Sequence, residues 1–227
     1  MSTATSPQLT LHTFFRSTSA GRIRVALNLK GLDYKPIFVN LFKDEHLTPE
    51  YAKLNPSRTV PLLVDHTSDR NVSIGQSQAA LEYLEEAFPD SKSLLPPKED
   101  IGGRAFVRAI VGLIVSDTQP VTSLRLLNAV EKLGADRLGF AREWTSRGLR
   151  AVEEMMEQSG KEGKYCYGDQ VTMADVCLVS AMWNAVLYGV DLAEFPRVSG
   201  VYDAMSRLEE VKKALPANQG DAPKEGK

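Results

Sequence analysis

The spacing of apolar residues changes at Pro89, and this change constrains the fold of the 227-residue chain more than any other feature. Before Pro89, segments that alternate apolar and polar residues take turns with segments of helical spacing. Beyond it only helical spacing remains. A proline-containing stretch over 90–99 is typical of an interdomain linker. The sequence therefore predicts an α/β domain over 1–89, an all-helical domain over 100–218 and a flexible tail over 219–227.

The first ninety residues predict the element order βαβαββα. Arg16 to Ser19 form a polar turn after the first strand, and Gly31 is placed to end the first helix as its C-terminal cap. The expected strands cover 9–14, 34–40, 60–64 and 72–74, and the expected helices cover 21–31, a short segment from Pro49, and 77–88. This order indicates a small mixed sheet covered by helices.

The helical half shows one segment that is apolar nearly all round. It covers 172–187, and we expect it to be the central helix of the second domain. Thr172 and Asp175 have the spacing of a capping box that would start this helix, a structural role. The other helices are expected at 106–114, 138–156 and 196–208.

Charge and composition exclude several classes of partner. The chain has 27 basic and 29 acidic side chains, a net charge of −2, which argues against nucleic-acid binding. No stretch approaches 18 apolar residues and the N-terminus lacks a signal-peptide core, so we expect neither a membrane span nor secretion. Cys166 and Cys177 cannot form a disulfide framework, which favours a cytoplasmic location. His12, His46 and His66 lack metal-ligand spacing, so we expect no metal site.

Two motifs place hydroxyl and amide groups at expected helix starts. Ser17, Thr18 and Ser19 precede the first helix, and Gln76 and Ser77 open the helix that follows the last strand. Free N–H groups and the helix dipole attract anions at such positions. Simple helix capping is the alternative interpretation of both motifs.

These motifs, together with Val60-Pro61 before the third strand, resemble the glutathione transferase superfamily. More narrowly, the run from Phe15 to Leu27 is similar to the zeta-class signature, which is shared with maleylacetoacetate isomerase. The resemblance covers nearly the whole chain. Its further motifs are Lys30 to Tyr34, Leu54-Asn55-Pro56, Glu82 to Glu86, Leu94-Leu95-Pro96, Gln119-Pro120 and Gly168 to Val179.

The resemblance implies a thioredoxin-like α/β domain followed by an all-α domain, a homodimer, and glutathione as the only cofactor. It implies that Ser17, Thr18 and Ser19 surround the glutathione sulfur, with Ser17 the first candidate to activate the thiol. It also implies that the Val60-Pro61 bond is cis and that Val60 pairs with the cysteinyl backbone of glutathione. A trans bond is the commoner general case, because only ~5–6% of X–Pro bonds are cis.

The resemblance assigns the remaining glutathione contacts to separate parts of the chain. Gln76 and Ser77 are expected to hold the γ-glutamyl carboxylate. Gln119 is expected to reach glutathione from the helical domain, and His46 falls near the position of the family's glutamine in the loop after the second strand.

The sequence departs from the zeta pattern around the expected substrate pocket. Ser19 stands at the family's cysteine position, and Gly21 opens space beside the sulfur. Leu187 stands where the family has an arginine that receives a substrate carboxylate. Arg125 could substitute for it, although a solvated helix charge is the alternative. Phe15 completes the expected pocket, with packing in the sheet and loop as its simpler interpretation.

Two enzymatic functions follow from the resemblance. The first is glutathione-dependent cis–trans isomerisation of an enone that is less acidic or bulkier than maleylacetoacetate. The second is conjugation of glutathione to an electrophile by a zeta-like transferase. A third hypothesis is a binding protein that uses the fold without catalysis.

Overall fold

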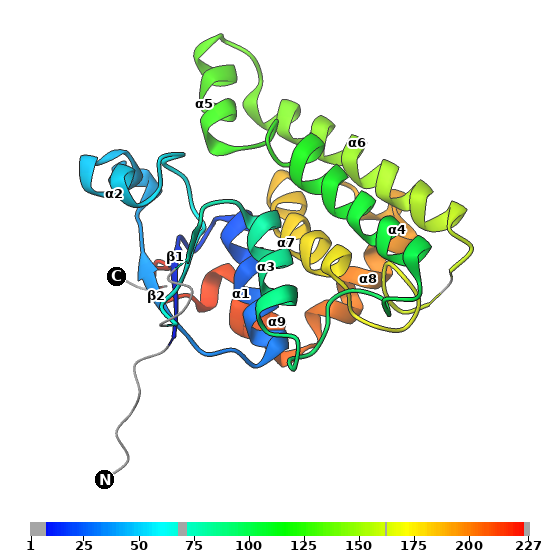
Figure 1. Ribbon diagram of the computed structural model, residues 1–227. Coiled ribbons are helices and arrows are strands. Elements are labelled where there is room, and N and C mark those ends of the chain that lie inside the picture. The colour runs from blue at the N-terminus through cyan, green and yellow to red at the C-terminus, as the bar shows by residue number, and fades with distance from the viewer. Residues whose placement is uncertain (1–7, 68–71, 162, 225–227) are drawn as a thin grey trace. The chain divides into compact units, whose positions relative to one another are not determined.

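Figure 1 shows the computed structural model of the chain, which describes residues 8–67, 72–161 and 163–224. The chain divides into two compact units. The first contains the residues up to Lys92 and those from Glu209 onward, and the second runs from Ser93 to Leu208. Within the described ranges, no helix is both long and apolar enough to cross a membrane.

The described residues of the first unit form a four-stranded mixed sheet with the order β2-β1-β3-β4. Its strands are β1 (Leu9–Thr13), β2 (Tyr34–Phe38), β3 (Leu62–Asp65) and β4 (Val72–Ile74). β1 runs parallel to β2 and antiparallel to β3, and β3 is antiparallel to β4. Residues along β1 are alternately buried and partly exposed, as its sequence pattern predicts. The predicted mixed sheet is confirmed.

The longest helix of this unit, α1, begins earlier than predicted. The helices are α1 (Thr18–Lys30), α2 (Pro49–Leu54), α3 (Ser77–Ala87) and α9 (Glu209–Ala214), and the 3-10 turns are η1 (Leu41–Lys43), η2 (Glu45–Leu47) and η5 (Pro216–Asn218). α1 starts at Thr18 rather than Gly21 because Ser17 caps it. Gly31 ends it with a φ of 66°, so the predicted C-terminal cap is confirmed. Most of α1 is buried because it packs against α3 and α9.

The end of the chain lies with the first unit, which differs from the predicted boundary at residue 218. α9 packs against α1 and buries Val211 and Ala214. Gln219 and Asp221, in the predicted flexible tail, make hydrogen bonds to this unit. A six-residue helix such as α9 is too short to show a helical period, which is why the sequence did not reveal it.

The second unit is helical, and α7 lies at its centre. Its elements are α4 (Ile101–Gly112), the π-helical η3 (Leu113–Thr118), α5 (Leu124–Lys132), α6 (Arg137–Gln158), α7 (Met173–Tyr188), the 3-10 turn η4 (Leu192–Glu194) and α8 (Pro196–Ser206). α7 packs against α4, α6 and α8, which confirms the central helix predicted over 172–187. α5 was not among the predicted helices, and of its residues only Leu127 is buried.

The start of α7 is fixed by the predicted capping box. One carboxylate oxygen of Asp175 accepts hydrogen bonds from the backbone N and from Oγ1 of Thr172, both at 2.7 Å. The other accepts from Cys166 N, also at 2.7 Å. Burial raises the pKa of the Asp175 carboxyl above its ordinary value. Leu94, in the predicted linker, is buried and accepts a hydrogen bond from Met173 N, so this part of the linker is packed.

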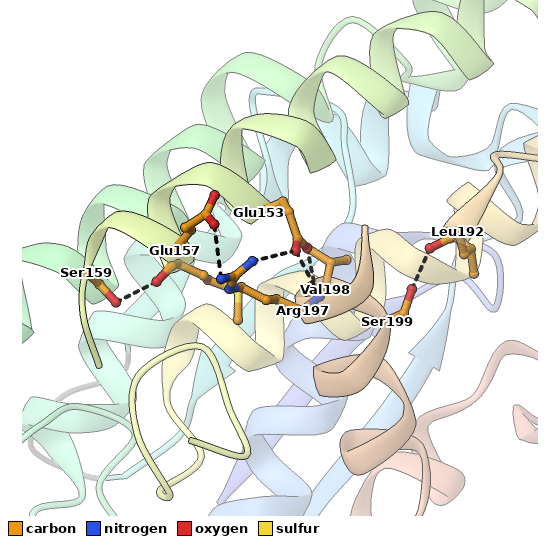
Figure 2. Close-up of polar contacts among 8 residues, drawn as sticks. Glu153, Glu157, Ser159, Leu192, Arg197, Val198 and Ser199 are labelled. Atoms are coloured by element: carbon orange, nitrogen blue, oxygen red, sulfur yellow. Dashed lines mark hydrogen bonds and ion pairs between the residues drawn. The ribbon is translucent and has the colours of Figure 1, made fainter. Parts of the chain in front are cut away.

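A buried carboxylate holds the start of α8, as Figure 2 shows. Glu153, on α6, is only 8% exposed and accepts hydrogen bonds from Arg197 N (3.0 Å) and Val198 N (2.9 Å). α8 has no side-chain cap of its own, so Glu153 satisfies N–H groups that a helix start leaves unpaired. The Arg197 guanidinium also contacts the exposed Glu157 at 3.2 Å.

We expect Glu153→Ala to lower the free energy of unfolding by about 2–3 kcal/mol, because two N–H groups at the partly buried start of α8 lose their acceptor. Glu157→Ala removes the exposed carboxylate that contacts Arg197, and we expect it to change the free energy of unfolding by less than about 0.5 kcal/mol. Urea unfolding followed by circular dichroism measures both variants. Equal and small effects would contradict the capping role of Glu153.

Candidate functional site

The turn between β1 and α1 presents hydroxyl groups at a helix start. Ser17 N donates to Phe14 O (3.0 Å), and Ser17 Oγ accepts a hydrogen bond from Ala20 N (3.1 Å). The capping interpretation of Ser17 is therefore confirmed, but it uses only an oxygen lone pair. The hydroxyl proton is left to be donated to an anion. Ser17 and Ser19 are partly exposed whereas Thr18 is buried, so Ser17 and Ser19 are the hydroxyls that solvent can reach.

The loop before β3 is held against α2. Thr59 O accepts hydrogen bonds from Tyr51 Oη (2.8 Å) and from Asn55 Nδ2 (2.7 Å). The next peptide bond, Val60-Pro61, is cis, which confirms the predicted isomer. Val60 shares an apolar cluster with Phe14, so this loop lies beside the β1–α1 turn.

The start of α3 lies close to α1 through a buried arginine. The fully buried guanidinium of Arg22 donates from Nη1 to Ser77 Oγ at 3.1 Å. Gln76, at the N-cap position, is exposed and makes no side-chain capping hydrogen bond, so capping does not explain its amide. A Cβ atom on the preceding Gly75 would lie 2.7 Å from Asn55 Oδ1, so this approach to α3 requires glycine.

These contacts bring three of the predicted motifs to one end of the sheet. The turn at Ser17, the cis bond at Pro61 and the start of α3 at Ser77 are linked through the β1–β3 pairing, the shared apolar cluster and Arg22. The starts of α1 and α3 thus lie at the same end of the sheet, and each carries a serine hydroxyl, Ser17 or Ser77. The buried Arg22 cation contacts the hydroxyl of Ser77. The arrangement suits a ligand that carries two separate anionic groups.

The other site residues predicted from the sequence are not drawn into this cluster by any described contact. His46 is half-buried in η2. In the second unit, Gln119 ends η3, Arg125 is exposed on α5, and Leu187 is 53% exposed near the end of α7. Their roles at the site remain predictions.

Phe15 and Gly21 have structural surroundings. The Phe15 ring packs edge-on against Phe14, with ring centres 4.7 Å apart, as its packing interpretation expects. Gly21 is buried within α1, and its N–H donates to Ser17 O at 2.8 Å. A role for either residue in a substrate pocket stays a prediction.

A cavity of about 410 Å³ lies in the second unit near the predicted pocket residues of that unit. It is lined by Leu127, Glu131, Ala135, Asp136, Arg137, Leu138, Ala141 and Tyr188. Arg125 and Leu187 do not line it themselves, but each lies within two residues of a lining residue. The lining combines apolar side chains with the ion pair between Arg137 and Glu131, whose N–O distance is 2.9 Å.

Two buried arginines, Arg22 and Arg24, were not predicted from the sequence. Arg24 donates to Phe14 O and Phe15 O, both at 3.2 Å, and so holds the backbone that leads into the β1–α1 turn. Both arginines interrupt an otherwise apolar stretch of α1. A buried charge is retained only with partners, so this interruption was the signal that could have revealed them.

Two family models match the chain: "Glutathione S-transferase, N-terminal domain" over residues 16–87 and "Glutathione S-transferase, C-terminal domain" over residues 127–217. The maleylacetoacetate isomerase of Aspergillus fumigatus is 45% identical over 227 residues, which cover 99% of this chain and 97% of that protein.

Solved structures agree with these matches. A maleylpyruvate isomerase, described as a bacterial zeta-class glutathione S-transferase, aligns with a TM-score of 0.87 and 35% identity, covering 94% of this chain and 100% of that chain. The maleylacetoacetate isomerase of Anaeromyxobacter dehalogenans, solved with glutathione in its active site, aligns with a TM-score of 0.85 and 37% identity. That alignment covers 96% of this chain and 99% of the other.

Proposed function

We propose that this chain, which belongs to the zeta class of the glutathione S-transferase family, is a glutathione-dependent cis–trans isomerase of an enone-type substrate. It is an enzyme with glutathione as its cofactor. The observation that carries the proposal is the meeting of the Ser17 turn, Val60-Pro61 and the start of α3 at one end of the sheet.

The donors at this end of the sheet fit the two anionic ends of glutathione. The turn offers the hydroxyls of Ser17 and Ser19 to a thiolate at the start of α1. The start of α3 offers Ser77 and the exposed Gln76 to a carboxylate, with the Arg22 cation against Ser77 Oγ. Hydroxyls and backbone N–H groups are the donors that such groups need.

The task of the turn is to stabilise negative charge on sulfur. An ordinary cysteinyl thiol has a pKa of ~8.5, so little of it is thiolate at neutral pH. Ser17 donates its O–H to the sulfur while its oxygen keeps the bond from Ala20 N, and the start of α1 adds its dipole. Both effects lower the pKa of a bound thiol. Bound glutathione supplies a thiolate that adds to the cis alkene, permits rotation about the resulting single bond and leaves unchanged.

The other predicted contacts complete the binding of glutathione in this proposal. Thr18 supports the turn from its buried position, and the backbone of Val60 pairs with the cysteinyl residue. Gln119 and His46 add contacts from the end of η3 and from η2. What supports the roles of Thr18, Val60 and Gln119 is the motif match of each position to the family, whereas His46 falls only near the position of the family's glutamine.

The substrate is an enone that carries fewer carboxylates than the family's diacid, or is bulkier. Leu187 cannot receive a carboxylate, and it stands at the family's arginine position. The exposed Arg125 is the candidate cation for a single remaining acidic group. Conjugation of glutathione to an electrophile is the second candidate function, and Ser19 in place of the family's cysteine, together with Leu187, favours it.

We place the enzyme in the cytoplasm as a homodimer. Cys166 and Cys177 are both buried and form no disulfide, which suits a reducing compartment. Sedimentation of the purified chain tests the dimer: a mass near 50 kDa supports it, because one chain weighs 25.0 kDa, and a mass of one chain contradicts it.

The function is tested by incubating the enzyme with glutathione and either maleylacetone or chlorodinitrobenzene. Loss of the cis isomer without a change of mass supports the isomerase, and a stable adduct with maleylacetone supports the transferase. Lack of retention on immobilised glutathione, together with no turnover of either compound, would leave only the binding-protein hypothesis.

A further inference from the structure

The C-terminal segment of the chain touches the turn that carries Ser17. Asp221 Oδ2 accepts a hydrogen bond from Phe15 N at 2.9 Å. The segment is anchored on α9, because Gln219 Nε2 donates to Lys213 O (2.9 Å) and Leu215 O (3.0 Å). A residue near the end of the chain therefore fixes a backbone group two positions before Ser17.

Gly220 lets the segment reach this position. A Cβ atom at Gly220 would lie 2.9 Å from Cζ of Phe38, on β2. The chain passes so close to this ring that glycine gives the unhindered route to Asp221. The segment that carries Asp221 is thus fixed to α9 through Gln219 and passes close to Phe38 of β2 at Gly220.

Arg24 holds the backbone that leads into the same turn. Besides Phe14 O and Phe15 O, its guanidinium donates to Thr13 Oγ1 (2.8 Å) and to Ala214 O (3.2 Å). Burial lowers the pKa of Arg24 to about 10, and the charges of Tyr34 and Asp221 act against that lowering. Phe15 is therefore held at both of its backbone groups, its N–H by Asp221 and its carbonyl by Arg24.

We propose that Asp221, acting with Arg24, is a positioning residue that holds the β1–α1 turn so that the Ser17 hydroxyl points at the glutathione sulfur. The inference rests on the proposed function for its catalytic consequence. It adds to that function a role for the segment that contains Asp221. Asp221 and Arg24 together hold the N–H and the carbonyl of Phe15, and we call this pair of contacts the Phe15 clamp.

The clamp matters because a hydrogen bond to a thiolate depends on direction. A hydrogen bond weakens steeply when the donor–H–acceptor angle departs from linearity. Small displacements of positioned groups also reduce reaction rates markedly. Asp221 does not touch glutathione in this account. Its removal should therefore change the thiol and the turn, and leave the carboxylate contacts of Gln76 and Ser77 intact.

The test compares Asp221→Ala, Asp221→Asn and the exposed control Asp33→Ala in the full-length chain. Hydrogen exchange without glutathione should show the amides of residues 14–20 exchanging about tenfold faster in Asp221→Ala, with β3 unchanged. Thiolate absorbance against pH should show a raised pKa of bound glutathione, and kcat should fall about fivefold. The dissociation constant for glutathione should be unchanged when it is measured at a pH below the pKa of the bound thiol, where the bound form is the neutral thiol. Asp221→Asn keeps an oxygen acceptor and should behave like the parent, as should Asp33→Ala.

Two results would overturn the inference. One is unchanged exchange in the turn and an unchanged thiol pKa in Asp221→Ala. The other is an equal loss in Asp221→Asn, which would assign the effect to charge rather than to the bond with Phe15. The exchange measurement needs no glutathione, so an enzyme that failed to bind glutathione at all would overturn the proposed function while the clamp was still judged on its own.

Discussion

Ser17→Ala is expected to lower kcat/KM for isomerisation about 100-fold, the size of effect seen when one preorganised donor to a developing anion is removed. The hydroxyl is the only part of Ser17 that changes, and it sits at the start of α1 with its proton left to donate. The pKa of bound glutathione should rise in the variant, since the thiolate loses a hydrogen bond. Thiolate absorbance against pH and steady-state rates measure the two effects.

Ser17 also caps α1, so the same change should cost about 1 kcal/mol of stability. Asp100→Ala separates the two roles, because Asp100 caps α4 in the second unit by accepting from Gly103 N at 2.8 Å. This control should lose stability and keep its activity. Ser17→Thr keeps the hydroxyl and should recover much of the rate. A Ser17→Ala enzyme with the parent's turnover would assign the thiol to another hydroxyl.

Ser77→Ala is expected to weaken glutathione binding about 10- to 30-fold while kcat changes little. Ser77 Oγ accepts a hydrogen bond from the buried Arg22 guanidinium at 3.1 Å. The hydroxyl proton of Ser77 therefore points away from the arginine and can be donated to a ligand. Loss of a hydrogen bond to a carboxylate accounts for a change of this size. Titration of glutathione by calorimetry and saturation kinetics give the affinity and kcat separately.

Ser73→Ala, on the exposed face of β4, is the matched control and should bind glutathione like the parent. The outcome that contradicts the assignment is a fall in kcat with unchanged affinity. Ser77 would then act on the chemistry at sulfur and not on the γ-glutamyl carboxylate.

Local chemistry made much of the first unit predictable. Gly31 ends α1 because a left-handed backbone suits glycine, and Ser17 caps the same helix because its hydroxyl reaches a free N–H. The first two strands were predictable from their alternation. The site motifs were found through their order along the chain, which matches a known family, whereas their meeting in space depends on sheet pairing and on Arg22.

The features that the sequence did not reveal depend on contacts between distant residues. Asp221 lies in a polar stretch that is typical of a flexible tail, and its position depends on the hydrogen bond to Phe15, 206 residues away in sequence, and on the anchoring of Gln219. α9 belongs with α1 because Arg24 reaches Ala214 O, a pairing that no local period predicts. Leu187 shows the opposite case, because the sequence comparison predicts its departure from the family's arginine, but the consequence depends on the substrate.

The central claim is that glutathione acts as a cofactor and is not consumed, and an assay with glutathione far below the concentration of maleylacetone tests it most directly. Proton NMR follows the cis and trans isomers together with free glutathione in the same sample. The account predicts that all of the cis isomer is converted while free glutathione stays constant. Conversion that stops after one equivalent of glutathione, with a stable adduct in the spectrum, would contradict it.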